Sequence, residues 1–379
     1  MPSNREPSSP EPNSLPPSNS PSRSPFESLT GAVGSPPEHY GNPLGEQRVL
    51  AAGDAVVDLS HRSILSVTGP DRLTWLDSLT SQALASLQPG DSAETLLLDP
   101  TGRLEYAVRV LDDGVTAWLL LEAEQAAGLH AWLDRMRFML RVEVADRSAE
   151  FATIGTLGSP HLSAASPNGV PLIWRDPWAS VTSGGHQYAH TDSHPSAAWT
   201  YSELLVQRET MADAAALPAA GTLALEALRI AAWRPRFATE VDEKTIPHEL
   251  DWLRSAVHLT KGCYRGQETV AKVHNLGHPP RRLVLLHLDG SEGVLPSRGA
   301  EVRSGDTAVG RITSSAIHFE LGPIALAVVK RNTDPAATLA VPIDEIVVSA
   351  AQELIVPPDA GTEANIPRIP RLGAVRRNA

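Results

Sequence analysis

Thr260-Lys261-Gly262-Cys263-Tyr264-Arg265-Gly266-Gln267-Glu268 is the stretch of sequence around which the rest of the chain is organised. It holds the only cysteine among 379 residues and one of four lysines. Gly262 and Gly266 bracket Cys263, so the backbone there is free to turn tightly or to approach a ligand closely. The pattern predicts a short strand over 256–259 before this turn and a helix over 267–274 after it.

The setting of Cys263 favours a reactive thiol. Lys261 and Arg265 lie beside it in the sequence, and the predicted helix begins just after it. Neighbouring cations and a helix N-terminus both stabilise the thiolate, which is the reactive form of cysteine. A lone cysteine is also often a small buried hydrophobe, so a purely structural role for Cys263 stays open.

The octapeptide Lys261-Gly262-Cys263-Tyr264-x-Gly266-Gln267-Glu268 resembles the signature of the YgfZ family. These folate-binding proteins are related to the T-protein, the aminomethyltransferase of the glycine cleavage system, and are implicated in the assembly or repair of iron–sulfur proteins. Further similarity lies at 228–230, 245–249 and 275–277. The resemblance is strongest from 220 to 290 and weaker over 55–145 and 290–335.

This resemblance implies a tetrahydrofolate-binding accessory protein with iron–sulfur client proteins as transient partners. It places the chemistry at Cys263 and Lys261. The folate-binding residues that it implies are Arg229, Tyr264, Gly266, Gln267 and Glu268. A guanidinium suits a pterin or a carboxylate, but a structural ion pair is an equally good interpretation of Arg229.

The fold class expected from the resemblance is α+β, in a T-protein-like arrangement of three domains. The N-terminal domains are mixed α/β, and the C-terminal domain is an antiparallel β-barrel. Alternating apolar residues punctuated by glycines after residue 280 independently favour a small barrel. The predicted division is a folate-binding domain formed by 46–148 and 215–278, an inserted α/β domain at 149–214, and a barrel at 279–355.

Both ends of the sequence differ in composition from the rest. Residues 1–45 contain 11 prolines and 10 serines. Such a segment buries too little apolar surface to offset the entropy lost on ordering, so a disordered extension is expected. Proline, arginine and glycine return from residue 356, and a loose tail is expected over 356–379.

Composition excludes several classes of protein. A net charge of -12 argues against nucleic acid as a partner. One cysteine cannot form a disulfide framework, a cysteine zinc site, or the four thiolates of an iron–sulfur cluster. No apolar run of 18 residues and no signal-peptide pattern are present, so no membrane partner and a cytoplasmic location are expected.

A folate-dependent one-carbon (aminomethyl) transferase is the alternative function. The T-protein resemblance implies catalytic aspartates on the strand near Gly102, but Tyr106 and Ala107 stand at the corresponding positions. The segment 199–203 likewise departs from the T-protein pattern. General acid–base chemistry needs a titratable group within hydrogen-bond reach, so these departures argue against aminomethyl transfer and leave enzymatic activity open. A degenerate scaffold that binds a partner without chemistry is a third possibility.

Histidines suggest two weaker hypotheses. His186, His190, Asp192 and His194 have alternating spacing, but they fall in a stretch rich in serine and glycine, which favours a solvated loop over a metal site. A second group flanks Cys263, and any of its members could serve as a base in a cysteine hydrolase. These histidines are His248, His258, His274 and His278.

Overall fold

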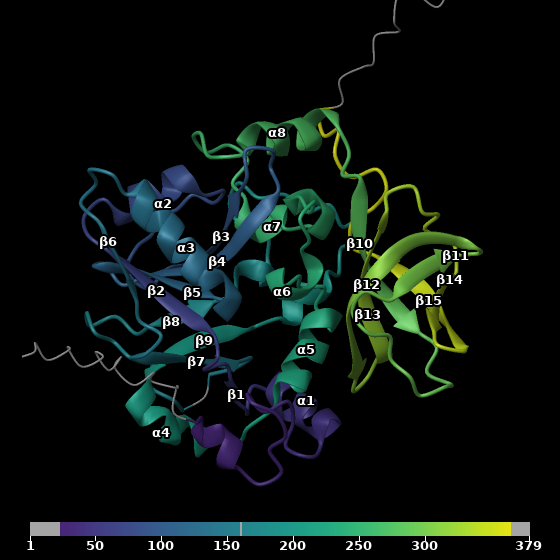
Figure 1. Ribbon diagram of the computed structural model, residues 1–379, viewed down its shortest axis with the longest axis horizontal. Coiled ribbons are helices and arrows are strands. Elements are labelled where there is room, and N and C mark those ends of the chain that lie inside the picture. Colours follow the sequence, from purple (N-terminus) through teal and green to yellow (C-terminus); the bar gives the residue numbers. More distant parts are fainter. Residues whose placement is uncertain (1–22, 160, 365–379) are drawn as a thin grey trace, which may run out of the picture.

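The computed structural model describes residues 23–159 and 161–364. Its strands form two open sheets on one side of the molecule and a closed barrel on the other, with short helices between them (Figure 1). The predicted α+β class with a C-terminal antiparallel barrel is confirmed. Within the described ranges, no helix combines the length and the apolar character needed to cross a membrane.

The first open sheet is antiparallel, in the order β3-β4-β5-β2-β6. Two helices, α2 (Arg72–Leu79) and α3 (Ala123–Met136), pack on one face, where Leu129 and Leu133 of α3 belong to the same apolar cluster as Leu119. The strands are β2 (Ser63–Thr68), β3 (Ser92–Leu98), β4 (Leu104–Asp112), β5 (Thr116–Leu121) and β6 (Glu143–Asp146).

Helix α2 is short, and a loop follows it. It ends at Leu79 because the Asp77 carboxylate accepts hydrogen bonds from the backbone N–H groups of Leu84, at 2.7 Å, and Ala85, at 3.2 Å. These bonds hold 80–85 as a loop. The Lys261 side chain of the octapeptide contacts this loop.

The second open sheet has the order β1-β7-β9-β8. Because β1 pairs with β7, this sheet combines residues from the predicted domains 46–148 and 149–214. Its inner face shares a large apolar cluster with the first sheet, including Trp118, Phe151 and Trp174. The strands are β1 (Val57–Asp58), β7 (Phe151–Thr156), β8 (Ile173–Arg175) and β9 (Ser202–Gln207).

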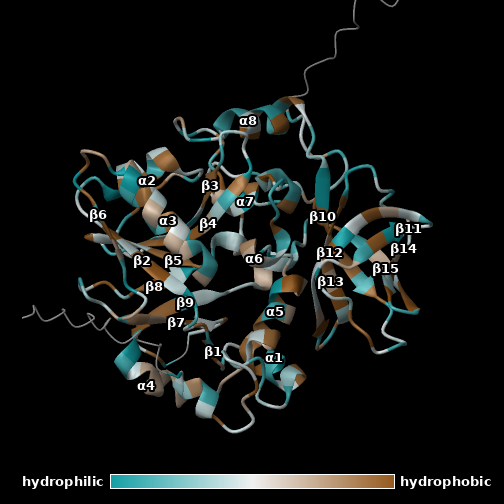
Figure 2. Ribbon diagram, in the orientation of Figure 1, coloured by the Kyte–Doolittle hydropathy of each residue, from teal (hydrophilic) through white to brown (hydrophobic). Residues whose placement is uncertain are grey.

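Short helices connect the open sheets to the barrel. The longest, α5 (Thr222–Ala231) and α8 (Gln267–Leu276), lie on different sides of this connection, and α8 turns a largely hydrophilic side outward (Figures 1 and 2). The strand expected over 256–259 is not formed, because Ala256 ends a helix and the next N–H groups bond to loops. The other helices are α1 (Pro43–Ala51), α4 (Met211–Ala215), α6 (Phe237–Glu240), η5 (Pro247–Leu250) and α7 (Leu253–Ala256).

The C-terminal barrel closes in the order β10-β13-β12-β11-β14-β15. The predicted strands near 283–288, 300–303, 308–314 and 324–330 are all present, and two further strands complete the ring. The barrel contains its own apolar core, and it packs against α5 through β12. The strands are β10 (Arg281–Leu288), β11 (Glu301–Ser304), β12 (Thr307–His318), β13 (Gly322–Lys330), β14 (Leu339–Ile343) and β15 (Ile346–Leu354).

Part of the extension expected to be disordered is packed on the fold. Phe26 is fully buried in an apolar cluster with Val56 and Ile154, and the Ser24 hydroxyl donates to Asp58 at 2.5 Å. The expectation for 1–45 is therefore wrong between residues 23 and 45, since a few apolar side chains suffice when a groove on the fold receives them. Residues 1–22 lie outside the described residues.

The expected loose tail also begins later than residue 356. Val356 is fully buried, and its N–H donates to the Leu283 carbonyl. Further along, the Glu363 N–H donates to the His274 carbonyl at the end of α8. The segment 356–364 is thus fixed to the barrel and to α8, and residues 365–379 lie outside the described residues.

Candidate functional site

Lys261 anchors the octapeptide loop to the rest of the protein. Its ammonium donates to the carbonyl oxygens of Asp77, Thr80 and Gln82 at 2.5, 2.8 and 2.8 Å. The side chain is almost completely buried, and burial lowers the pKa of Lys261 although Asp77 opposes this shift. Because three carbonyls accept its three N–H groups, the Lys261 ammonium is fixed in place and is not a free cation beside the thiol.

Gly266, the second glycine of the loop, has a steric role. It adopts φ +83°, and a Cβ atom there would lie 2.7 Å from the Asp99 carbonyl oxygen and 3.0 Å from the Leu98 side chain. Gly102 faces Gly266 from the turn at 99–102, and a Cβ atom at Gly102 would lie 2.7 Å from Thr269. The two glycines let the turn at 99–102 pack directly against the N-terminus of α8.

The remaining residues of the octapeptide do not converge on a common cavity. Tyr264 is buried in the large apolar cluster, and Arg265 forms a bidentate ion pair with Glu105. The Gln267 amide donates to the Lys261 carbonyl at 3.2 Å, and Glu268 is exposed. These predicted folate-binding residues therefore form part of the loop itself and do not line a shared cavity.

Cys263 is exposed at the tip of this loop. The structural interpretation of Cys263 as a buried hydrophobe is therefore wrong. Among the residues that the structure describes, no histidine is hydrogen-bonded to its thiol. His248 instead is fully buried and bonds through Nε2 to the Val270 carbonyl, and burial lowers the pKa of His248 to about 3. The paired thiol and base of a cysteine hydrolase are not brought together.

The histidine-rich segment is likewise dispersed. His186 packs edge-to-face against His274, His190 lies near Asp359 at 3.6 Å, and His194 packs on Trp233. Within 23–159 and 161–364, no group of three or more histidine, cysteine or acidic residues is arranged to hold a metal ion.

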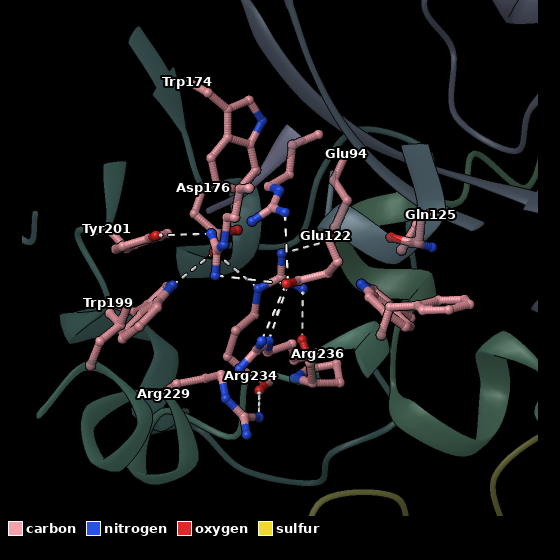
Figure 3. Close-up of a pocket in the computed structure, with 17 residues that line it drawn as sticks. Glu94, Glu122, Gln125, Trp174, Asp176, Trp199, Tyr201, Arg229, Arg234 and Arg236 are labelled. Carbon is pink, nitrogen blue, oxygen red and sulfur yellow. Dashed lines mark hydrogen bonds and ion pairs between the residues drawn. The ribbon is translucent and has the colours of Figure 1, made fainter. Parts of the chain in front are cut away.

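A cavity lined by aromatic side chains and buried ion pairs, which we call the main cavity for this lining and not for its size, lies elsewhere, between the two open sheets, the start of α3, and α5 (Figure 3). Its open volume is about 70 Å³. The aromatic side chains on its walls are Trp174, Trp199, Tyr201, Phe237 and Trp252. Aromatic walls beside well-placed polar groups are typical of sites for flat organic ligands.

Buried ion pairs line the same cavity. Glu203 is fully buried and accepts hydrogen bonds from Arg62, Arg109 and the Tyr201 hydroxyl. Arg234 bonds to Glu94 at 2.6 Å and to Asp176 at 2.9 Å, and Glu122 accepts from Arg236 at 3.1 Å. Such pairs are stable only when their partners compensate the loss of hydration.

These pairs fix the charge of the cavity wall. Burial disfavours ionised Glu122, but Arg62, Arg236 and Arg109 together hold its pKa well below the usual range. Burial and then Glu203 raise the pKa of Tyr201, so its hydroxyl stays protonated. Arg236 is the most exposed arginine of the group and marks the side of the cavity nearest solvent.

Several buried polar atoms of the cavity wall have no partner within the described part of the chain. Both polar atoms of the Gln125 carboxamide are unpaired, although the side chain is only 6% exposed. The others are Arg62 Nε and Trp252 Nε1. Buried polar groups nearly always have partners, so these donors and acceptors are available to a ligand or to water in the cavity.

Arg229 does line this cavity, but every donor of its guanidinium is used by the protein. It donates to Glu226, to Glu240 at 3.1 Å, to the Arg234 carbonyl at 2.7 Å and to the Ser314 hydroxyl at 2.7 Å. Arg229 therefore forms structural ion pairs, which was one of the two interpretations that the sequence allowed. Its expected role as a folate ligand is not supported by this geometry.

The two residues at the aspartate positions point to different sides of β4. Ala107 lines the main cavity, whereas Tyr106 lies in an outer groove, where its hydroxyl comes close to Gly128 of α3. Side chains alternate along a strand, which explains this separation. Ala107, the one of these two residues that faces the cavity, therefore presents only a methyl group there.

Sequence reasoning missed most of the residues that line the cavity. Gln125 was detectable in principle, because it shares one helical face with Leu129 and Leu133, and a polar residue in an apolar stripe is a candidate ligand. Tyr201 and Glu203 belong to the segment set aside for departing from the T-protein pattern. Their contacts with Arg62 and Arg109 cross between sheets and have no signal in local spacing.

Comparison with known proteins supports the T-protein part of the resemblance. No protein-family model matches the chain. An Arabidopsis thaliana protein named as a chloroplastic transferase is 26% identical over 301 residues, which are 72% of this chain and 65% of that protein, just under two thirds of its length. The aminomethyltransferase of Nostoc sp. is 26% identical over 315 residues, with 77% and 81% covered. The aminomethyltransferase of Streptomyces coelicolor is 28% identical over 325 residues, with 79% and 83% covered.

A solved structure shows the same fold. The crystal structure of glycine cleavage system aminomethyltransferase T from Bartonella henselae superposes with a TM-score of 0.66 at 17% identity, covering 83% of this chain and 89% of that one. The chain therefore has the T-protein fold, and its sequence is similar to aminomethyltransferases. The narrower assignment to the YgfZ family stays a prediction.

Proposed function

We propose that the main cavity binds tetrahydrofolate or a derivative, and that the chain serves iron–sulfur enzymes as an accessory protein. The unpaired polar atoms of Gln125, Arg62 and Trp252 around an aromatic-lined space carry this proposal. A reduced pterin presents N–H donors and a carbonyl acceptor on the edge of a flat ring. The carbonyl oxygen of the Gln125 carboxamide suits a donor, while the guanidinium and indole N–H groups suit the carbonyl.

Binding of this ligand requires some rearrangement at the solvent side. A volume of about 70 Å³ holds a few water molecules. Arg236 is only half-buried and is held by carboxylates of Glu122 and Glu226, so it is the side chain most readily displaced. Its movement would enlarge the cavity without disturbing the pairs around Glu203.

Calorimetry with 5-formyltetrahydrofolate, a stable reduced folate, tests the ligand. We expect saturable binding that weakens at least tenfold in Gln125→Leu, because that change leaves pterin groups unpaired. The matched control is Gln88→Leu, whose glutamine is exposed on a loop. No binding to the folded wild-type protein, or equal weakening in both variants, would refute a folate site in this cavity.

The second candidate is aminomethyl transfer, which the names of the bacterial relatives favour. Against it, Ala107 presents no titratable group at the position where the resemblance implies an aspartate. We expect no methylene-tetrahydrofolate formation above the uncatalysed rate when tetrahydrofolate and formaldehyde are supplied. Formation of methylene-tetrahydrofolate above that rate, if it is abolished in Glu203→Gln, would instead favour the transferase.

The iron–sulfur role is proposed for the loop that carries Cys263. The support is the octapeptide and the exposure of its thiol, on a loop whose base Lys261 fixes. Cells that carry Cys263→Ala should lose activity of iron–sulfur enzymes, while the purified variant should melt at the wild-type temperature. Full enzyme activities in those cells would remove this role. The cytoplasmic location stays a prediction.

A further inference from the structure

The connection between α3 and β6 exposes an unusual run of large apolar side chains. Phe138 is 88% exposed and Met139 is 85% exposed, and they are flanked by the partly exposed Met136 and Leu140. Phe138 also adopts φ +41°, a conformation rarely seen for a bulky residue. Four large apolar side chains within five residues of a short connection, one of them on a residue with positive φ, indicate a contact surface. We call residues 136–140 the apolar knob.

A groove begins beside the apolar knob and continues along α3 and β4. It has a volume of about 500 Å³, and Arg135, the residue before the knob, forms part of its wall. Its aromatic lining consists of Tyr106 and Trp132, with Gly128 and Ala131 of α3 leaving room between them. Tryptophan, tyrosine and arginine are the residues that most often dominate binding energy at protein interfaces.

The charges beside the knob decide what kind of surface it fits. Arg137 pairs with Asp134 at 3.1 Å, and Arg141 pairs with Asp71 at 2.6 Å. Within the described part of the chain, Arg135 has no ion-pair partner. An anionic membrane is recognised by clusters of four or more basic residues, and one uncompensated arginine does not provide this. A flat bilayer would also leave the groove unfilled.

We propose that the apolar knob and the adjoining groove form a docking surface for an acidic segment of a partner protein. An apolar anchor of the partner packs on Phe138 and Met139, a neighbouring side chain enters the groove between Tyr106 and Trp132, and a carboxylate pairs with Arg135. This surface is separate from the folate cavity and does not depend on the proposed ligand. Arg265 of the octapeptide loop also lines the groove, so a docked partner contacts the loop that carries Cys263.

Selection of peptides from a random 12-residue phage library on the full chain tests this surface. We expect peptides that combine an aromatic or aliphatic anchor with at least one acidic residue. Their affinity should fall at least tenfold in the double variant Phe138→Ser/Met139→Ser and in Arg135→Glu. The matched control is Val347→Ser, which removes an apolar side chain that is 65% exposed on the barrel. All variants are first shown to melt like the wild type.

Three results would overturn the proposal. The first is the absence of any enriched peptide that distinguishes the wild type from the double variant. The second is binding of the wild type, but not the double variant, to vesicles of 30% phosphatidylserine in phosphatidylcholine, which would assign the knob to a membrane. The third is concentration-dependent dimerisation in sedimentation that Phe138→Ser/Met139→Ser abolishes, which would assign it to a second copy of the chain.

Discussion

At the residue scale, Lys261 holds the octapeptide loop to the rest of the protein through three backbone carbonyls. We expect Lys261→Met to lower the free energy of unfolding by about 3 kcal/mol, because three buried carbonyls lose a charged donor. Urea denaturation measures this, and Lys272→Met, an exposed change on α8, is the matched control. Alkylation of Cys263 in the folded variant should proceed at the wild-type rate. A slower rate with unchanged stability would restore Lys261 as a partner of the thiol.

Asp251 gives the second prediction at this scale, in the pH dependence of stability. The side chain is fully buried with one carboxylate oxygen unpaired, and burial raises the pKa of Asp251 to about 7, although the Tyr188 N–H and Arg254 oppose this. Between pH 4 and pH 7 the folded state therefore holds a proton that the unfolded state has released. The Asp251 contribution to stability is thus present at low pH and is lost as pH rises through 7.

Asp251→Asn should remove this pH dependence while keeping the backbone, since asparagine tolerates φ +55°. We expect similar unfolding free energies for variant and wild type near pH 4, and a growing advantage for the variant up to pH 8, at about 1.4 kcal/mol per unit of pKa shift. Denaturant titrations across this range measure the difference, with the exposed Asp192→Asn as control. Parallel curves for wild type and Asp251→Asn would show that the carboxyl is not held protonated.

At the element scale, the two glycines of the octapeptide provide a matched pair. Gly266→Ala should destabilise the protein by about 2 kcal/mol or more, because the residue has φ +83° and its Cβ atom would meet the Asp99 carbonyl. Gly262→Ala should be tolerated, since a Cβ atom there would have no neighbour within 4 Å. Thermal melts of both variants decide this. Equal losses would mean that the close approach of α8 to the turn at 99–102 does not set the requirement for glycine.

The elements also show where sequence reasoning succeeds. The hairpin at 104–121, the helix after Gly266 and most barrel strands follow from local periodicity and turn residues, and these are confirmed. The octapeptide itself led to the correct fold. The cavity could not be predicted, because Gln125, Tyr201 and Arg234 meet only when three segments distant in sequence are packed together. Likewise, the burial of Phe26 depends on apolar side chains contributed by β7, β9 and α4.

At the scale of the whole molecule, Arg229 connects the open-sheet half to the barrel. It extends from α5, pairs with Glu226 and Glu240, and donates to Ser314 of β12. Ser314 in turn donates to Glu240, so one buried network ties α5, α6 and the barrel together. Removing one member of such a network leaves its charged partners buried and unpaired.

We therefore expect Arg229→Met to cost about 3–5 kcal/mol of stability, with Arg229→Lys restoring little because an ammonium cannot serve four partners at once. Denaturant melts measure this against Arg303→Met, which removes an exposed pair on the barrel and should change stability by about 0.5 kcal/mol or less. Folate affinity of the folded Arg229→Met protein provides the second readout. If folate affinity fell sharply while stability stayed at the wild-type value, the main role of Arg229 would be contact with the ligand. Its bonds between the open-sheet half and the barrel would then contribute little to stability.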